Sequence, residues 1–225
     1  MNYVQYQPFI QLISKEQPKI DAYVPENIFH AQQIGFEKLQ TYILQEYQEQ
    51  YKCNNVQEKF NHNELKQINM QWILNKLKLD SEDELLNLLS IEQIDSVCAA
   101  IFNIENHKEF IIGDDTGVGK GRILAAIVRY ALINKDSNMN VIFFTEGSHL
   151  FSDFWRDLAN LNITEQLDTF ILHGNGKVYD QQGNKIAQSF NKTIMKEMLD
   201  NGKFQYHDKK QKKDIQLNTN LILTT

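Results

Sequence analysis

The sequence predicts an α/β fold in which a parallel sheet follows a helical N-terminal region. Before about residue 108, apolar residues recur at helical spacing. Beyond that point, short continuous apolar runs alternate with helical stretches. Continuous runs are typical of strands buried on both faces of a parallel sheet. A glycine-rich segment, Gly113–Arg122, lies between the first run and the helix after it.

The N-terminal region, residues 1–88, is predicted to be helical and preceded by an extended arm. All three prolines lie in the first 25 residues, which favours an extended backbone there. The apolar pattern predicts helices over about 27–58 and 64–79. Ser81 is followed by acidic residues, as a helix N-cap would be. Ser90 and Gln93 have the spacing of a capping box that begins another helix.

The α/β part begins near residue 109, and 109–145 is expected to form one βαβ unit. The predicted elements in order are a strand at Phe110–Ile112, a helix at Gly121–Lys135, a strand at Val141–Thr145, a helix at His149–Leu161, and strands at Thr169–Leu172 and Asn220–Thr225. A polar insertion at about 174–219 is expected to contain a hairpin that turns at Gln182–Asn184. It also carries a lysine cluster, which is either a solvated loop or a contact for nucleic-acid phosphates.

The glycine-rich segment has the layout of a phosphate-binding loop. Gly117 and Gly119 allow a tight turn that brings N–H groups close to an anion. The following helix adds the positive end of its dipole, and Lys120 adds a mobile cation. The usual loop pattern has glycine where Asp114 stands and a hydroxyl residue where Gly121 stands. A glycine-rich turn that only connects a strand to a helix is the alternative.

Composition limits the class of protein. Apolar residues make up 42% and charged residues 23% of the 225 residues, as in globular proteins. We expect a cytoplasmic protein without a membrane partner, because no long apolar run and no leader pattern occurs. Cys53 and Cys98 lack metal-ligand spacing and are expected to be core thiols. Residues 1–100 hold 8 Lys/Arg and 14 Asp/Glu, so the net charge of −6 resides there. This acidity counts against tight nucleic-acid binding by the chain alone.

Four motifs together resemble the Strawberry notch family of superfamily 2 helicase-like ATPases, particularly its bacterial, plasmid and phage members. They are Leu89–Val97, Ile112–Arg122, Phe144–Glu146, and Phe151 with Arg156–Leu158. The family loop reads G-D-x-x-G-[VI]-G-K-G-R, so Asp114 and Gly121 match the family pattern. The resemblance covers about residues 89–175. It implies that 89–225 is the first RecA-like P-loop NTPase domain, incomplete before its Walker B motif.

The resemblance also implies site residues and cofactors. Gln93 would read the adenine of ATP, although a plain exposed helix residue is the alternative. The cofactors would be ATP and Mg²⁺. The nucleotide would be bound by residues of the loop, namely Thr116, Gly117, Val118, Gly119, Lys120, Gly121 and Arg122. A structural N-cap role for Thr116 and a surface role for Arg122 are the alternatives. The nucleic-acid contacts would be Thr145, Glu146, Arg156 and Thr224. How magnesium is held stays open because Gly121 has no hydroxyl. Trp155, which precedes Arg156 in the sequence, is expected to pack in the core.

The sequence contains no D-E-x-[DH] motif, so we expect no catalytic residue and no ATPase activity within the chain. The first hypothesis is the ATP-binding N-terminal part of a DNA helicase or translocase that works only as a complete protein. DNA would be bound with the help of downstream helicase domains and, in some members, methyltransferase-like domains. The alternative is a non-catalytic protein-interaction or nucleotide-sensing module in phage–host conflict. A small-molecule kinase is a third option, against which the helicase-like motifs argue.

Overall fold

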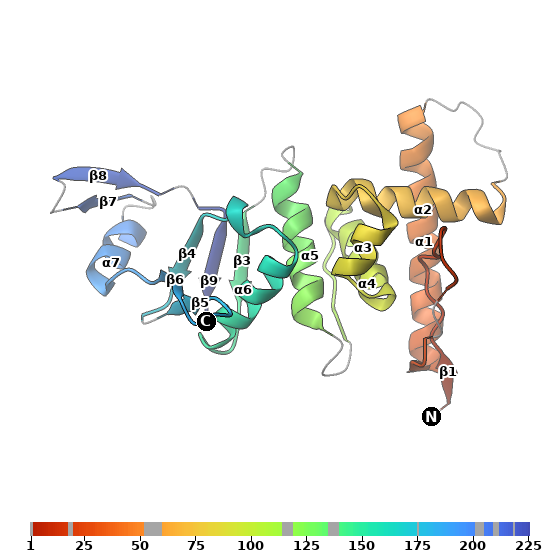
Figure 1. Ribbon diagram of the computed structural model, residues 1–225, viewed down its shortest axis with the longest axis horizontal. Helices are drawn as coiled ribbons and strands as arrows, with labels where there is room; N and C mark the ends of the chain where they lie inside the picture. The colour runs from red at the N-terminus through yellow and green to blue at the C-terminus, as the bar shows by residue number, and fades with distance from the viewer. Residues whose placement is uncertain are drawn as a thin grey trace. The chain divides into compact units, whose positions relative to one another are not determined.

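The computed structural model describes residues 2–17, 20–51, 60–113, 119–134, 140–174, 176–200, 205–208, 212–217 and 219–225 (Figure 1). The chain divides into two compact units, Met1–Ile123 and Leu124–Thr225. The division at residue 88 between a helical region and a P-loop NTPase domain stays a prediction, and each unit is described by itself below.

The first unit is helical, as predicted. Its helices are α1 (Glu26–Tyr51), α2 (His62–Leu77), α3 (Glu82–Leu88) and α4 (Ile91–Glu105). Polar side chains cap the N-termini of three of these helices. Asn61 and Glu64 form a capping box at α2, Ser81 caps α3, and Ser90 and Gln93 form a capping box at α4. These caps satisfy N–H groups that have no partner inside the helix, so each helix begins at a defined residue.

The N-terminal arm is extended, as predicted, and it is also packed against the helices. Strand β1 (Tyr3–Gln5) pairs antiparallel with β2 (Tyr23–Pro25), and Ile10 between them is fully buried. The Asp95 carboxylate on α4 accepts hydrogen bonds from the Tyr6 hydroxyl and from the backbone N–H groups of Phe9 and Ile10, each N–H at 2.8 Å. Asp95 is 1% exposed, so it fixes the arm from inside the unit.

A second carboxylate fixes the next part of the arm. Glu82, at the start of α3, accepts from the N–H of Ile13 at 3.0 Å and from the N–H and hydroxyl of Ser14 at 3.3 and 3.1 Å. Glu82 is only 9% exposed. Buried carboxylates are tolerated when donors surround them, and here the arm supplies the donors.

A polar network joins α1, α2 and α4. The Lys76 ammonium contacts Glu46 at 3.0 Å and Glu105 at 2.5 Å. The indole N–H of Trp72 donates to Glu46 at 2.6 Å, and the Tyr42 hydroxyl donates to Glu105 at 2.9 Å. The Lys76 side chain is 17% exposed. One cation therefore sits between carboxylates from two other helices.

The second unit contains the predicted parallel sheet, in the order β3-β9-β4. Its strands are β3 (Val141–Phe144), β9 (Leu221–Thr224) and β4 (Thr169–Leu172), all parallel. Helix α6 (Leu150–Asn160) covers one face, where Phe154 stacks on Phe143 with ring centroids 3.9 Å apart. Helix α5 (Lys120–Ile133) spans the boundary between the units, and its Arg129 donates to the Leu161 carbonyl at 2.7 Å.

The polar insertion has structure of its own. After the short 3₁₀ helix Thr164–Gln166 and strand β4, the hairpin of β5 (Lys177–Tyr179) and β6 (Lys185–Gln188) turns at the predicted place. Gly183 in this turn has a φ of +82°. Helix α7 (Lys192–Asp200) and the hairpin of β7 (Gln205–Asp208) and β8 (Lys213–Gln216) follow. Part of the lysine cluster, Lys209 and Lys210, lies outside the described residues.

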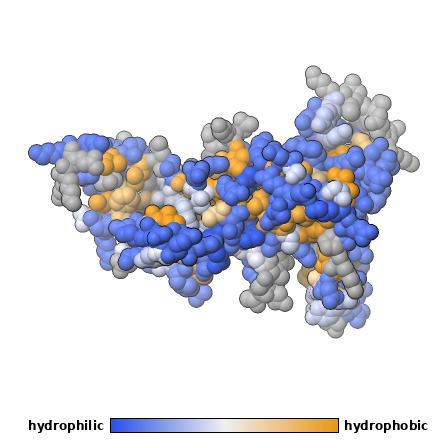
Figure 2. Space-filling view, in the orientation of Figure 1, coloured by the Kyte–Doolittle hydropathy of each residue, from blue (hydrophilic) through white to orange (hydrophobic). Residues whose placement is uncertain are grey.

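Two details of the strand prediction are wrong. Residues 110–112 form no strand, and Ile111 is 87% exposed, so the predicted βαβ unit lacks its first strand within the part described. Strand β3 exists, but it is not buried on both faces, because Ile142 and Phe144 are 61% and 71% exposed. They point away from the face that α6 covers, and β3 is an edge strand. Hydrophobic residues are visible at the surface of both units (Figure 2).

Two further expectations concern membranes and cysteines. No single helix among the described residues is long and apolar enough to cross a membrane; α3 and α4 reach that length and composition only as a pair, which is bent by 99°. Cys98 is fully buried, as predicted, whereas Cys53 lies outside the described residues.

We predict that Lys76→Met destabilises the chain far more than Lys15→Met. Removing Lys76 leaves the carboxylates of Glu46 and Glu105 without their shared cation, which should cost about 2–4 kcal/mol. The pair of Lys15 and Asp83 is exposed, so its loss should cost at most about 1 kcal/mol. Urea unfolding of the three proteins measures both, and equal losses would show that the network contributes no more than a surface pair.

We predict that Asp95 makes the free energy of unfolding depend on pH. Burial raises the pKa of this carboxyl to about 7, although the hydrogen bonds from the arm act in the opposite direction. A raised pKa means that the fold favours the protonated form. The contribution of Asp95 is therefore complete below pH ~4 and is lost as the pH rises towards 7.

The free energy of unfolding of wild type minus that of Asp95→Asn should accordingly fall between pH 4 and 7, by an amount on the order of a few kcal/mol. Denaturant titrations at several pH values give this difference. Parallel curves for the two proteins would contradict the assignment.

Candidate functional site

Gly119 lies in the glycine-rich segment and directly precedes the first residue of helix α5, Lys120. Its φ of +80° lies in the left-handed region, and its carbonyl accepts from the N–H of Arg122 at 2.9 Å and of Ile123 at 3.3 Å. The first turn of α5 contains no acidic residue, but it contains Lys120 and Arg122. The positive end of the helix dipole and these two cations make this end of α5 attractive to an anion.

The structure brings Gln93 and Gly119 together, although they are far apart in sequence. A Cβ atom built on Gly119 would lie 2.4 Å from Nε2 of Gln93, so the end of the Gln93 side chain would have to move. Position 119 therefore favours glycine for its left-handed backbone, and an added Cβ would also displace the Gln93 amide.

Gln93 is itself held in place by the start of α4. Its Oε1 accepts from the backbone N–H of Ser90 at 3.1 Å, while the Ser90 hydroxyl accepts from the N–H of Gln93 at 3.5 Å. This capping box orients the amide group toward the loop. Gln93 is partly buried and has a structural role as a capping residue, and its contact with adenine stays a prediction.

Arg122 points to the end of another helix. Its Nη1 donates to the carbonyl of Leu88, the last residue of α3, at 3.3 Å. A cation at a helix C-terminus is favourable because it meets the negative end of the dipole. Lys120 and Gly121 are partly buried at the start of α5. The predicted loop residues Thr116, Gly117 and Val118 lie outside the described residues, so their roles stay predictions.

The residues predicted to contact nucleic acid lie partly together in the second unit. Thr145 directly follows β3, and its N–H donates to the carbonyl of Thr224 at the end of β9, at 3.1 Å. Glu146 is the next residue and is exposed. These residues stand at the carboxyl edge of the parallel sheet, where ligands of such sheets bind. The Thr224 hydroxyl donates to the Leu172 carbonyl at 3.0 Å and is 5% exposed, so it is engaged within the protein.

Arg156 forms its ion pairs with residues of its own helix and not with residues of the sheet edge. On α6 it pairs with Asp153 at 2.9 Å and approaches Asp157 at 3.8 Å, and its side chain is 47% exposed. In the part of the chain that the structure describes, no hydrogen bond or ion pair connects it to Thr145 or Thr224. Trp155 is 8% exposed and packs in the core, as expected.

The structure adds residues that the sequence reasoning missed. Leu88 supports Arg122 through a backbone carbonyl, which leaves no mark in the sequence. His173 follows β4, and its Nδ1 lies 2.8 Å from the hydroxyl of Thr225 at the sheet edge. A polar residue directly after an apolar run was the available signal for His173.

The described residues suit a phosphate group better than they define a metal site. Gly119 permits close backbone approach, and the start of α5 supplies positive charge beside it. No cluster of three His, Cys, Asp or Glu side chains suited to a metal ion occurs among the residues described. We therefore assign no protein ligand for magnesium among these residues.

The sequence of the chain matches one known protein family. The family model described as P-loop containing NTP hydrolase pore-1 matches residues 51–206, which is more than half of the chain. The matched region includes Gln93, Gly119 and the sheet strands β3 and β4. No curated protein and no solved structure gave a significant match.

Gly119→Ala should lower nucleotide affinity by at least about tenfold, because the new methyl group would displace Gln93 in addition to straining the backbone. The matched control is Gly183→Ala, since Gly183 has nearly the same φ but nothing within 4 Å of an added Cβ. The control should lose only about 1–2 kcal/mol of stability and keep nucleotide binding. Titration with a fluorescent ATP analogue measures both, and equal affinities would refute the role of the close approach.

Proposed function

Because the chain belongs to the P-loop containing NTP hydrolase pore-1 family, we propose that it is the ATP-binding N-terminal part of a Strawberry notch-like superfamily 2 DNA helicase or translocase. The observation that carries the proposal is the position of Gln93 against Gly119. Gln93 precedes Lys120 by 27 residues, and the fold returns it to the loop. Glutamine upstream of a phosphate-binding loop is the arrangement that the helicase resemblance implies.

In this proposal the described residues bind and orient ATP. The start of α5 holds the phosphates, and Lys120 neutralises part of their charge. Gln93, whose side chain is positioned by the capping box with Ser90, would contact adenine. Magnesium, when bound with the nucleotide, would supply positive charge that offsets the negative charge of the phosphates.

Hydrolysis and movement on DNA belong to the complete protein in this proposal. Phosphoryl transfer also needs an acidic magnesium ligand, a residue that orients water, and an arginine finger. We assign these to other segments of a longer protein, together with most of the DNA contacts. At the sheet edge, Thr145 and Glu146 would contact the sugar–phosphate backbone of DNA. The acidic helical unit would contribute little to DNA binding because like charges repel.

A nucleotide-binding titration of wild type, Lys120→Ala and Lys108→Ala tests the proposal. Lys120→Ala should weaken ATP binding at least about tenfold, since a charge-assisted contact to phosphate is worth about 1.5–3 kcal/mol. Lys108 is exposed and precedes the loop, so its replacement should leave affinity unchanged. If all three proteins bind ATP equally, or if none binds it, the proposal fails.

A second candidate function is a non-catalytic module that binds another protein, as part of phage–host conflict. The observation in its favour is an open groove on the helical unit, which is independent of the loop. This function predicts that Lys120→Ala leaves the relevant interaction intact. The two functions are compatible within one chain, because loop and groove are built from different residues.

A further inference from the structure

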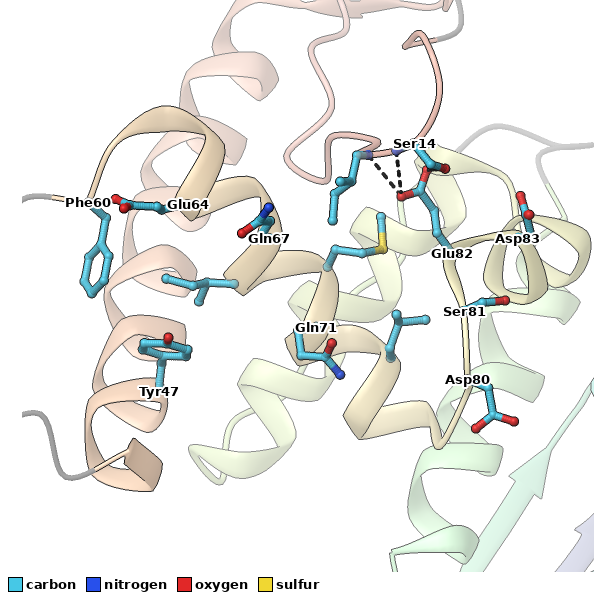
Figure 3. A pocket seen from close by; sticks show the side chains of 14 residues that line it. Ser14, Tyr47, Phe60, Glu64, Gln67, Gln71, Asp80, Ser81, Glu82 and Asp83 are labelled. Carbon is cyan, nitrogen blue, oxygen red and sulfur yellow. Dashed lines mark hydrogen bonds between the residues drawn. The ribbon is translucent and has the colours of Figure 1, made fainter.

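A groove of about 730 Å³ lies on the first unit (Figure 3). Its volume falls within the range of sites that bind ligands. Helix α2 forms its base from Glu64 to Leu74, a length of ~15 Å at the rise of an α-helix. This length corresponds to about three turns of a second helix laid along the first.

The groove has a mixed base and one apolar end. At the base, Ile68, Met70 and Leu74 of α2 are nearly fully buried, and the exposed Gln67 and Gln71 lie among them. Tyr47 of α1 and Phe60 stand at one end with ring centroids 6.0 Å apart, edge to face. Such a surface can bury apolar side chains of a partner.

The opposite end of the groove is formed by the N-terminal arm. Ile13 lies there and is 47% exposed, although it is a large apolar side chain. The hydrogen bonds from Ile13 and Ser14 to Glu82 hold this wall in place (Figure 3). The groove is therefore a built feature, because its walls are fixed to each other by contacts within the unit.

Among the residues that the structure describes, the charged side chains lining the groove have one sign. They are the acidic residues Glu64, Asp80, Glu82 and Asp83. Asp80 and Asp83 are exposed at the rim, and Lys15 offsets Asp83 from outside the lining. The first 100 residues also carry the whole net charge of −6. The field at the groove favours a cation and opposes DNA, RNA and anionic lipid surfaces.

We propose that this groove binds a cationic amphipathic helix of a partner protein. The apolar side of that helix would lie on Ile13, Tyr47 and Phe60, and its Lys or Arg residues would face the acidic rim. Accessible apolar groups inside an acidic rim are complementary to a helix that has an apolar stripe flanked by basic residues. The interaction is independent of the nucleotide, so its failure would leave the proposed function unaffected.

The probe for this proposal is a fluorescein-labelled amphipathic peptide of about 14 residues made only of leucine and lysine. A leucine–glutamate peptide with the same apolar pattern is the control probe. Fluorescence anisotropy on the full chain should show at least about tenfold tighter binding of the lysine peptide. Hydrogen exchange of the wild-type chain with that peptide should show protection within residues 64–74.

Three variants decide where the peptide binds. Gln71→Trp narrows the groove from an exposed position on α2 and should weaken binding about tenfold. The double variant Asp80→Lys/Asp83→Lys should do the same. The matched control is Asp21→Lys/Glu37→Lys, which changes the net charge equally at exposed positions outside the groove and should leave binding within about twofold.

Each outcome has a defined meaning. Loss of binding in both groove variants, with retention in the control, supports the proposal. Equal loss in the two charge-reversed variants means general electrostatic attraction and overturns it. Equal binding of the two peptides, or protection outside α2 alone, overturns it as well, and neither result depends on the folding of a variant.

Discussion

The first two turns of α4 are the part of the first unit on which its other features depend. One carboxylate there, Asp95, fixes the N-terminal arm, and one amide, Gln93, lies against Gly119. The two residues are only two positions apart, so arm and loop are held by the same short stretch of helix. The capping box with Ser90 defines where that stretch begins. A change in how α4 starts would therefore reach both the arm and the loop.

Helix α3 connects the groove to the glycine-rich loop. Glu82 on α3 holds the arm wall of the groove, while the carbonyl of Leu88 at the other end of α3 holds Arg122. A helix of seven residues thus has one end at the groove and the other beside the glycine-rich loop. The Leu88 carbonyl is one of the backbone acceptors that a helix C-terminus leaves unpaired, whereas Glu82 accepts through its side-chain carboxylate.

Local signals allowed most elements to be predicted, and long-range pairing explains the failures. Capping residues located the helices, and apolar runs located β3, β4 and β9. Residues 110–112 have the same apolar composition, but a strand needs a neighbour for its backbone groups, and composition does not reveal one. The Gln93 position followed from a motif, whereas the contact of Arg122 with Leu88 did not, because any residue supplies a carbonyl. Similarly, no local pattern relates Asp95 to N–H groups 85 and 86 residues away.

The exposure of Ile142 and Phe144 bears on how the chain behaves in concentrated solution. Both lie on β3, the outer strand of a three-stranded sheet, and that strand has an edge that no described strand occupies. An apolar strand with an open edge can take up a strand from another molecule, and natural proteins usually protect such edges. Colloidal stability of this chain should therefore be limited by β3, and a lysine at position 142 would be the most direct means of improving it.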